Sequence, residues 1–134
     1  MIGLVLVSHG ELCKYLLASA EMICGPQENV STVCLVPEDS PDSFREKMVA
    51  AIQSLDASDG ILVLGDLCGG TPCNVTASLT AEYRYECILG MNLPMLLEVL
   101  TNRDGSTPVQ ELAALAEQSG KAGVVNLLQM LRQP

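Results

Sequence analysis

The chain has 134 residues, and 16 acidic against 7 basic side chains give it a formal net charge of −9. Hydrophobic residues make up 49% of it, which excludes intrinsic disorder and predicts one folded domain over residues 1–134. The acidic balance, with no Lys/Arg cluster, argues against nucleic acids as partners. No apolar run reaches the roughly 20 residues of a membrane span, and no basic segment precedes the first apolar run as in a signal peptide. We therefore expect a cytoplasmic protein.

Short apolar runs, typical of strands covered on both faces, alternate along the chain with segments of helical periodicity. Strands are predicted over residues 2–7, 30–36, 60–64 and 87–91. Helices are predicted to begin near residues 11, 41, 72, 93 and 108. A last apolar run, residues 124–128, fits either a strand or a turn of helix.

Capping residues mark several helix boundaries. Gly25 predicts the end of the first helix. Ser40 followed by Pro41 predicts the start of the second, and Thr71 followed by proline predicts the start of the third. The first helix is expected to bury an apolar face made of Leu12, Tyr15, Leu16, Met22 and Ile23. The second is expected to bury Phe44, Met48, Ile52 and Leu55.

The alternation of strands and helices predicts an α/β fold built on a doubly wound, mainly parallel sheet. Right-handed crossovers then place helices on both faces of the sheet. For four strands we expect the order 2-1-3-4. This order makes the first and third strands neighbours at the topological switch point, where open α/β sheets bind their ligands.

Reactive side chains follow the first and third predicted strands. His9, the only histidine, follows the first, and Asp66 follows the third. We expect Asp66 to hold Nδ1 of His9, which fixes the tautomer and leaves Nε2 free as a base or nucleophile. Gly69, Gly70 and Thr71 begin a helix and offer backbone N–H groups to an anion. An imidazole facing an anion site predicts a phosphohistidine formed by direct phosphoryl transfer.

Each of these residues also has a purely structural interpretation. His9 could be a surface-loop histidine, Asp66 could cap a turn, and Thr71 could serve only as an N-cap. Asn92 follows the fourth predicted strand and is expected at the same edge of the sheet.

Six cysteines are scattered along the chain, and we expect reduced thiols rather than a disulfide framework. Cys34 and Cys87 lie in strand-like runs, where a thiol packs as a small hydrophobic group. Cys68 and Cys73 have a spacing that zinc sites use, and either could be a nucleophile, but a second pair of metal ligands is missing. The chain also lacks nucleotide-binding glycine motifs, so neither a metal nor a cofactor is predicted.

Three motifs in order, VSHG, GDLCGGTPCN and MNLPMLLE, resemble the IIA component of the mannose/fructose/sorbose-type bacterial sugar phosphotransferase system. The resemblance covers essentially the whole chain. It implies that His9 is the phosphorylated histidine and that Asp66 orients it. It also implies that the Thr71 hydroxyl binds phosphate, supported by the neighbouring amides of Gly69 and Gly70.

The resemblance also implies partners. The chain would accept a phosphoryl group from the histidine-containing phosphocarrier protein and pass it to a IIB component, which acts with the membrane IIC and IID components. A homodimer with an exchanged C-terminal strand is implied, and residues 124–128 resemble that strand. Family members commonly carry aromatic residues where this chain has Cys68 and Cys73. No IIB domain is recognised in the sequence, so we expect either that IIB is a separate chain or that this sequence is a piece of a longer protein.

Three alternatives stay open on the sequence alone. The nearest is the related phosphotransfer subunit of phosphoenolpyruvate-dependent dihydroxyacetone kinase, although the GGTP and NLPMLLE segments favour the sugar transporter. A second is a phosphohistidine protein that reports sugar flux to a regulator. A third is a binding module of flavodoxin type. The transported sugar is not encoded in this chain, because the resemblance assigns specificity to the membrane components.

Overall fold

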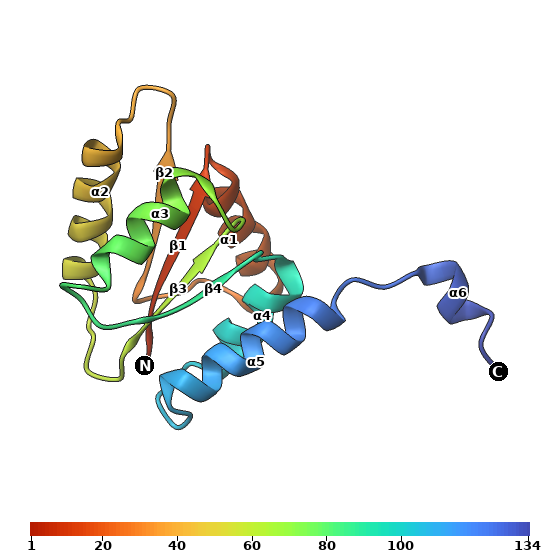
Figure 1. The fold of residues 1–134 in the computed structure, drawn as a ribbon. Helices are drawn as coiled ribbons and strands as arrows, with labels where there is room; N and C mark the ends of the chain where they lie inside the picture. Colours follow the sequence, from red (N-terminus) through yellow and green to blue (C-terminus); the bar gives the residue numbers. More distant parts are fainter.

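A computed structural model describes residues 1–134 as a four-stranded sheet with six helices (Figure 1). The strands are β1 (Gly3–His9), β2 (Val30–Leu35), β3 (Ile61–Gly65) and β4 (Glu86–Leu89). The helices are α1 (Leu12–Cys24), α2 (Pro41–Ser54), α3 (Gly70–Leu79), α4 (Leu93–Asn102), α5 (Val109–Ala122) and α6 (Leu127–Leu131). No helix has both the length and the apolar character of a membrane span.

The sheet has the order β2-β1-β3-β4 and all of its pairings are parallel, which confirms the predicted α/β topology. β1 is central, with His9 opposite Leu35 of β2 and Val7 opposite Gly65 of β3. The carboxyl ends of β1 and β3 therefore lie side by side at the switch point between the crossovers.

The core has two apolar clusters, one on each face of the sheet. Alternating side chains of β1 divide between them, with Leu4 and Leu6 on one face and Val5 and Val7 on the other. Helices α1, α4 and α5 cover the first face, whereas α2 and α3 cover the second. Both faces of the sheet are thus buried, as parallel sheets require.

The predicted start of α2 is confirmed in detail. The Ser40 hydroxyl accepts from the Ser43 N–H at 3.1 Å, and the Ser43 hydroxyl accepts from the Ser40 N–H at 2.9 Å. This reciprocal capping box precedes Pro41 at the first helical position. Three residues of the predicted buried face, Phe44, Met48 and Ile52, are buried in the helix. The fourth, Leu55, is the C-cap that follows the helix and is partly buried.

The predicted buried face of α1 is wrong at four of its five residues, and only Leu16 is partly buried. Leu12, Tyr15, Met22 and Ile23 are all exposed, and Met22 keeps 89% of its surface. The helix instead packs on the sheet through Cys13 and Ala20, with Leu16, Leu17 and Cys24 partly buried beside them. The small residues allow a close approach to the strands, which leaves the large apolar side chains on the opposite face.

The expected C-terminal strand over residues 124–128 is also not found. Residues 124–126 form no regular element, and α6 follows as a short helix. In Figure 1 this segment extends away from the rest of the molecule. A strand needs a neighbouring strand to pair its backbone, whereas a helical turn pairs its own. Residues 124–128 pair with no strand in the single chain, so strand exchange stays a prediction.

Candidate active site

His9 is the last residue of β1 and lies where the chain turns toward α1. The N–H of Gly10 donates to the carbonyl of Leu35 at 2.7 Å, which extends the pairing with β2 past the histidine. Gly10 has a φ of +57°, a left-handed conformation that suits glycine. The His9 side chain remains 44% exposed, so the strand presents it to solvent at the edge of the sheet.

Asp66 holds His9 from the neighbouring strand end. One carboxylate oxygen, Oδ2, lies 2.8 Å from Nδ1 of the His9 ring and accepts from the His9 backbone N–H at 2.8 Å. The other oxygen, Oδ1, accepts from the Leu67 N–H at 2.9 Å. With the Nδ1 proton directed at the carboxylate, Nε2 carries the free lone pair. The structure therefore brings together the two residues that the strand ends placed at one edge.

The environment of Asp66 favours its charged form. Its side chain is only 7% exposed, and burial alone would raise its pKa. The hydrogen bonds from the His9 backbone, the His9 ring and the Leu67 backbone outweigh that burial, so the pKa lies below its usual range. Asp66 is therefore a carboxylate at neutral pH and can balance a positive charge on the imidazole.

Gly70 leaves room for the free ring nitrogen. A Cβ at this position would lie 2.8 Å from Nε2 and 2.9 Å from Cε1 of His9. Gly70 also has a φ of +80°, which disfavours any residue with a side chain. Glycine thus leaves Nε2 uncovered.

The start of α3 differs from the prediction. The helix begins at Gly70 with Gly69 as its N-cap, so Thr71 lies inside the first turn and is not the cap. No side chain caps this end, and no hydrogen bond within the chain engages the backbone N–H of Gly70 or Thr71. The first turn of a helix concentrates partial positive charge at such free groups, which makes them a place for an anion. Of these residues, Gly70 lies against His9 and is flanked by Gly69 and Thr71, and their binding of an anion stays a prediction.

Ser8 supports the site and was not singled out from the sequence. Its buried hydroxyl donates to the Gly10 carbonyl at 3.0 Å and accepts from the Cys13 N–H at 2.9 Å. The bond to Cys13 supplies the side-chain cap that α1 otherwise lacks. The only sequence signal was a polar residue at the end of an apolar run.

Other residues expected near this edge have structural roles. The Asn92 side chain accepts from the Met95 N–H at 3.0 Å and donates to the Gly120 carbonyl at 2.9 Å, so it caps α4 and ties α5 to it. Cys68 is exposed in the loop before α3, whereas Cys73 is half-buried in α3. Cys73 lines a cavity of about 210 Å³ that is also lined by Cys87. No three His, Cys, Asp or Glu side chains are grouped closely enough to hold a metal ion.

Comparison with known proteins shows the family to which the chain belongs. Residues 3–118 match the family model described as the PTS system fructose IIA component. The chain is 40% identical to the mannose-specific EIIAB component of Escherichia coli over 92% of its own length, but it spans only 38% of that relative. It is 33% identical to the fructose-specific EIIA component of Bacillus subtilis, covering 89% of the chain and 84% of the relative.

A solved structure shows the same fold. The EIIA component from Streptococcus agalactiae superposes with a TM-score of 0.87 at 32% identity, covering 96% of this chain and 99% of that one. The fold and these similarities define the class, the IIA components of phosphotransferase systems. Within that class the chain belongs to the mannose/fructose/sorbose-type family, whose model matches it over most of its length.

Proposed function

We propose that this chain carries a phosphoryl group on Nε2 of His9 and passes it on during sugar uptake. The observation that carries the proposal is the uncovered Nε2, which faces the bare Cα of Gly70 at the start of α3. Asp66 holds the opposite ring nitrogen at 2.8 Å. These contacts support roles for His9 as the nucleophile, Asp66 as the carboxylate that orients it and the start of α3 as the anion site.

Phosphoryl transfer at this site needs no proton removal. The Nε2 lone pair forms the new bond to phosphorus while the bond between phosphorus and the donor nitrogen breaks, and the electron pair of that bond returns to the donor. The Nδ1 proton stays on the ring, where the Asp66 carboxylate balances the charge that develops. The N–H groups of Gly70 and Thr71 and the Thr71 hydroxyl would hold the phosphoryl oxygens. The reaction reverses by the same path toward an acceptor.

The family supports particular partners. The donor would be the histidine-containing phosphocarrier protein and the acceptor a histidine of a IIB component, acting with the membrane IIC and IID components. The mannose-specific relative is named an EIIAB component, which agrees with a IIB acceptor. The net charge of −9 favours steering toward a partner with basic residues around its own histidine. On-rates that fall with added salt would support this, and salt-independent rates would contradict it.

The decisive experiment is intact-protein mass spectrometry after incubation with phosphoenolpyruvate, enzyme I and the histidine phosphocarrier. We expect one acid-labile, alkali-stable phosphate on the parent chain and none on His9→Ala. Asp39→Asn serves as a matched control because it alters a buried carboxylate away from His9, and it should still be phosphorylated. A folded parent chain that takes no phosphate from active donors would contradict the proposal.

We also propose a homodimer in which residues 124–134 of each copy pack on the other. Six apolar side chains in this segment are more than half exposed: Val124, Val125, Leu127, Leu128, Met130 and Leu131. β4 is an edge strand with one side unpaired, so it can accept a strand from a second copy. Light scattering should give a dimer mass for the full chain and a monomer mass after deletion of residues 124–134. A monomeric full chain would contradict the proposal.

A further inference from the structure

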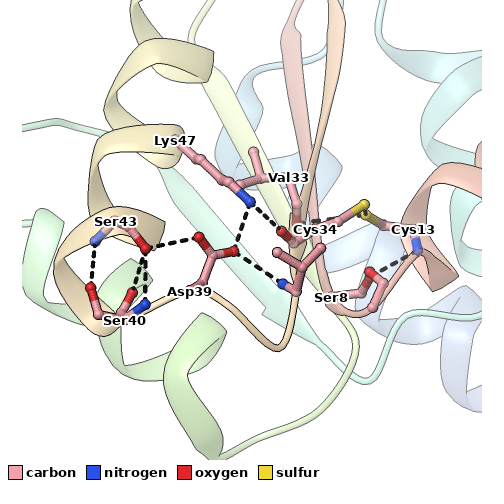
Figure 2. Close-up of polar contacts among 10 residues, drawn as sticks. Ser8, Cys13, Val33, Cys34, Asp39, Ser40, Ser43 and Lys47 are labelled. Atoms are coloured by element: carbon pink, nitrogen blue, oxygen red, sulfur yellow. Dashed lines mark hydrogen bonds and ion pairs between the residues drawn. The ribbon is translucent and has the colours of Figure 1, made fainter.

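The thiols of two cysteines lie close together beside the end of β1, the strand that carries His9. Sγ of Cys13 lies 3.7 Å from Sγ of Cys34 (Figure 2). Cys13 is in the first turn of α1, whereas Cys34 is on β2, opposite Ser8 of β1. Both cysteines thus lie in the apolar cluster on one face of the sheet, and Cys34 is paired with the residue that precedes the histidine.

The two thiols differ in access to solvent. Cys13 is fully buried, and its thiol donates to the Val33 carbonyl at 3.7 Å. Burial raises the pKa of the Cys13 thiol to about 11, so it is protonated at neutral pH. Cys34 is half-buried on the edge strand of the sheet. A small oxidant therefore reaches Cys34 first, with Cys13 already in place behind it.

We propose that Cys13 and Cys34 are a modification site, joined by an intramolecular disulfide on oxidation, and that this disulfide slows the phosphorylation of His9. The effect on His9 rests on the proposed function, whereas the disulfide itself does not. Forming it requires the sulfur separation to shrink from 3.7 Å to about 2.05 Å, a shift of the first turn of α1 toward β2.

The oxidant that fits this chemistry is a peroxide. The Cys34 thiolate attacks one oxygen of hydrogen peroxide, the O–O bond breaks, and Cys34 becomes a sulfenic acid as the first water leaves. Sulfur of Cys13 then attacks sulfur of Cys34, Cys13 gives up its proton, and the second water leaves. Two thiols and one peroxide thus give one disulfide and two waters, with two electrons passing from sulfur to oxygen.

Ser8 connects this pair to His9. Its hydroxyl accepts from the Cys13 N–H at 2.9 Å and donates to the Gly10 carbonyl at 3.0 Å. His9 lies between Ser8 and Gly10, so the same hydroxyl fixes both sides of the histidine. A displacement of the Cys13 backbone loosens this hydroxyl, and the ring loses the alignment that in-line transfer requires. A misplacement of about 1 Å can cost about 10²-fold in rate.

The pair is suited to a reversible change. Disulfides inside cells are usually transient and redox-sensing, and thiol reductants return them to thiols. No other cysteine reaches this pair through a contact in the structure. Cys24 is in the last turn of α1 and its thiol donates to the Ala20 carbonyl at 3.2 Å.

The test is to treat the full chain with one equivalent of hydrogen peroxide, block the remaining thiols and map the tryptic peptides. We expect residues 1–14 linked to residues 15–45 through Cys13 and Cys34. Cys34→Ser should abolish the link, and Cys13→Ala provides a second variant. Cys24→Ser is the matched control, because it removes the other thiol from the same peptide and should keep the link.

The same samples are then phosphorylated with and without prior dithiothreitol. We expect the oxidised chain to take phosphate about tenfold more slowly, with the rate restored by the reductant and insensitive to peroxide in Cys34→Ser. Failure to find the Cys13–Cys34 link, or a Cys73–Cys87 link in its place, would overturn the modification site. A full link with an unchanged phosphorylation rate would overturn its effect on His9.

A failure of the proposed function has a separate signature. If neither the reduced nor the oxidised chain takes phosphate, phosphoryl transfer is contradicted, and the mapped peptides still decide whether the disulfide forms. The amide NMR signals of Ser8, His9 and Gly10 measure the coupling without any phosphate. They should move on oxidation of the parent chain and not of Cys34→Ser, and unmoved signals in a linked chain would overturn the coupling.

Discussion

Two nearly buried carboxylates follow strand ends in this molecule, and they serve opposite purposes. Asp39 follows β2 and its side chain is 6% exposed, whereas Asp66 follows β3 and is 7% exposed. Both carboxylates accept hydrogen bonds from the backbone and contact a basic side chain. The difference is whether the basic partner keeps a nitrogen that no group of the chain engages.

The Asp39 corner is closed. Its carboxylate binds Nζ of Lys47 at 2.7 Å, the Val36 N–H at 3.0 Å and the Ser43 hydroxyl at 2.8 Å (Figure 2). The Lys47 bond, followed by those from Val36 and Ser43, lowers the pKa of Asp39 to about 2. Lys47 also donates a hydrogen bond to the Cys34 carbonyl, so these contacts fix the start of α2 to β2.

The Asp66 corner is open. Its basic partner is an imidazole, which has two nitrogens on opposite sides of the ring, and Asp66 engages only Nδ1. The second nitrogen faces Gly70, where no side chain covers it. The same kind of buried carboxylate thus builds a structural joint when its partner is a lysine, and a candidate site when its partner can present a second atom.

The largest expected effect breaks the open corner. In Asp66→Asn the side-chain amide can donate to Nδ1, which moves the ring proton to Nε2 and removes the lone pair. A comparable change in a serine protease costs about 10⁴-fold, and we expect phosphorylation of His9 to slow by at least about 10²-fold. Rapid-quench mass spectrometry measures the rate. Asp39→Asn should phosphorylate near the parent rate, and equal losses in both variants would contradict the distinction between the corners.

A smaller effect is expected from covering the free nitrogen. Gly70→Ala places a Cβ against Nε2 in a left-handed conformation, so phosphorylation should fall by about 10²-fold. Gly25→Ala is the matched control, because Gly25 has a similar φ of +86° and nothing within 4 Å of its Cβ position. Both variants should lose about 1–2 kcal/mol of unfolding free energy in urea. Only Gly70→Ala should lose phosphorylation. If Gly70→Ala were phosphorylated at the rate of the parent chain, Nε2 would not be the acceptor.

Removing the support beneath the open corner should lower stability and also slow the phosphorylation of His9. Ser8→Ala leaves the buried Cys13 N–H without its acceptor, at a cost of about 1–3 kcal/mol in unfolding free energy. Ser31→Ala on the neighbouring strand provides a control, since the Ser31 hydroxyl is exposed at its contact with Ser54 and should change stability by no more than about 0.5 kcal/mol. Equal stabilities from urea titrations of the two variants would contradict the role of Ser8.

The smallest effect concerns acid. The pKa of Asp39 is about 2 when folded and about 3.9 when unfolded, so its contribution to stability is complete above pH ~4 and is lost as the pH falls toward 2. Asp39→Asn should therefore show a shallower fall of unfolding free energy between pH ~4 and pH ~2. Parallel curves of unfolding free energy against pH for parent and variant would contradict the lowered pKa of Asp39. Asp66, whose pKa is also lowered, should contribute to the same fall.

Most of the sheet could be predicted because its determinants are local. Short, largely apolar runs marked all four strands, and the order 2-1-3-4, chosen by analogy with other small doubly wound sheets, is confirmed. Since parallel strands end at one edge, the positions of His9 and Asp66 in the sequence were enough to expect their contact. Ser40 and Pro41 likewise specify the start of α2 without help from the rest of the chain.

The features that escaped prediction depend on partners distant in the sequence. Hydrophobicity favoured the large residues of α1, but the helix buries Cys13 and Ala20 among residues of the sheet that are distant in the sequence. The need for glycine at position 70 comes from the His9 imidazole, 61 residues away in the sequence, and no local pattern shows that contact. For residues 124–128 the choice between strand and helix depends on whether a neighbouring strand is present.

One oxygen of Asp66 receives both the backbone and the ring of His9, so the ring is fastened at two points to a single atom. Such a ring cannot swing from a donor toward an acceptor. Under the proposed function, donor and acceptor must each bring the reacting atom to the same fixed nitrogen, and the two cannot occupy it together. Steady-state rates measured at varied donor and acceptor concentrations should therefore give parallel lines in double-reciprocal plots. This is the pattern of a ping-pong mechanism, in which the carrier binds its two partners in turn.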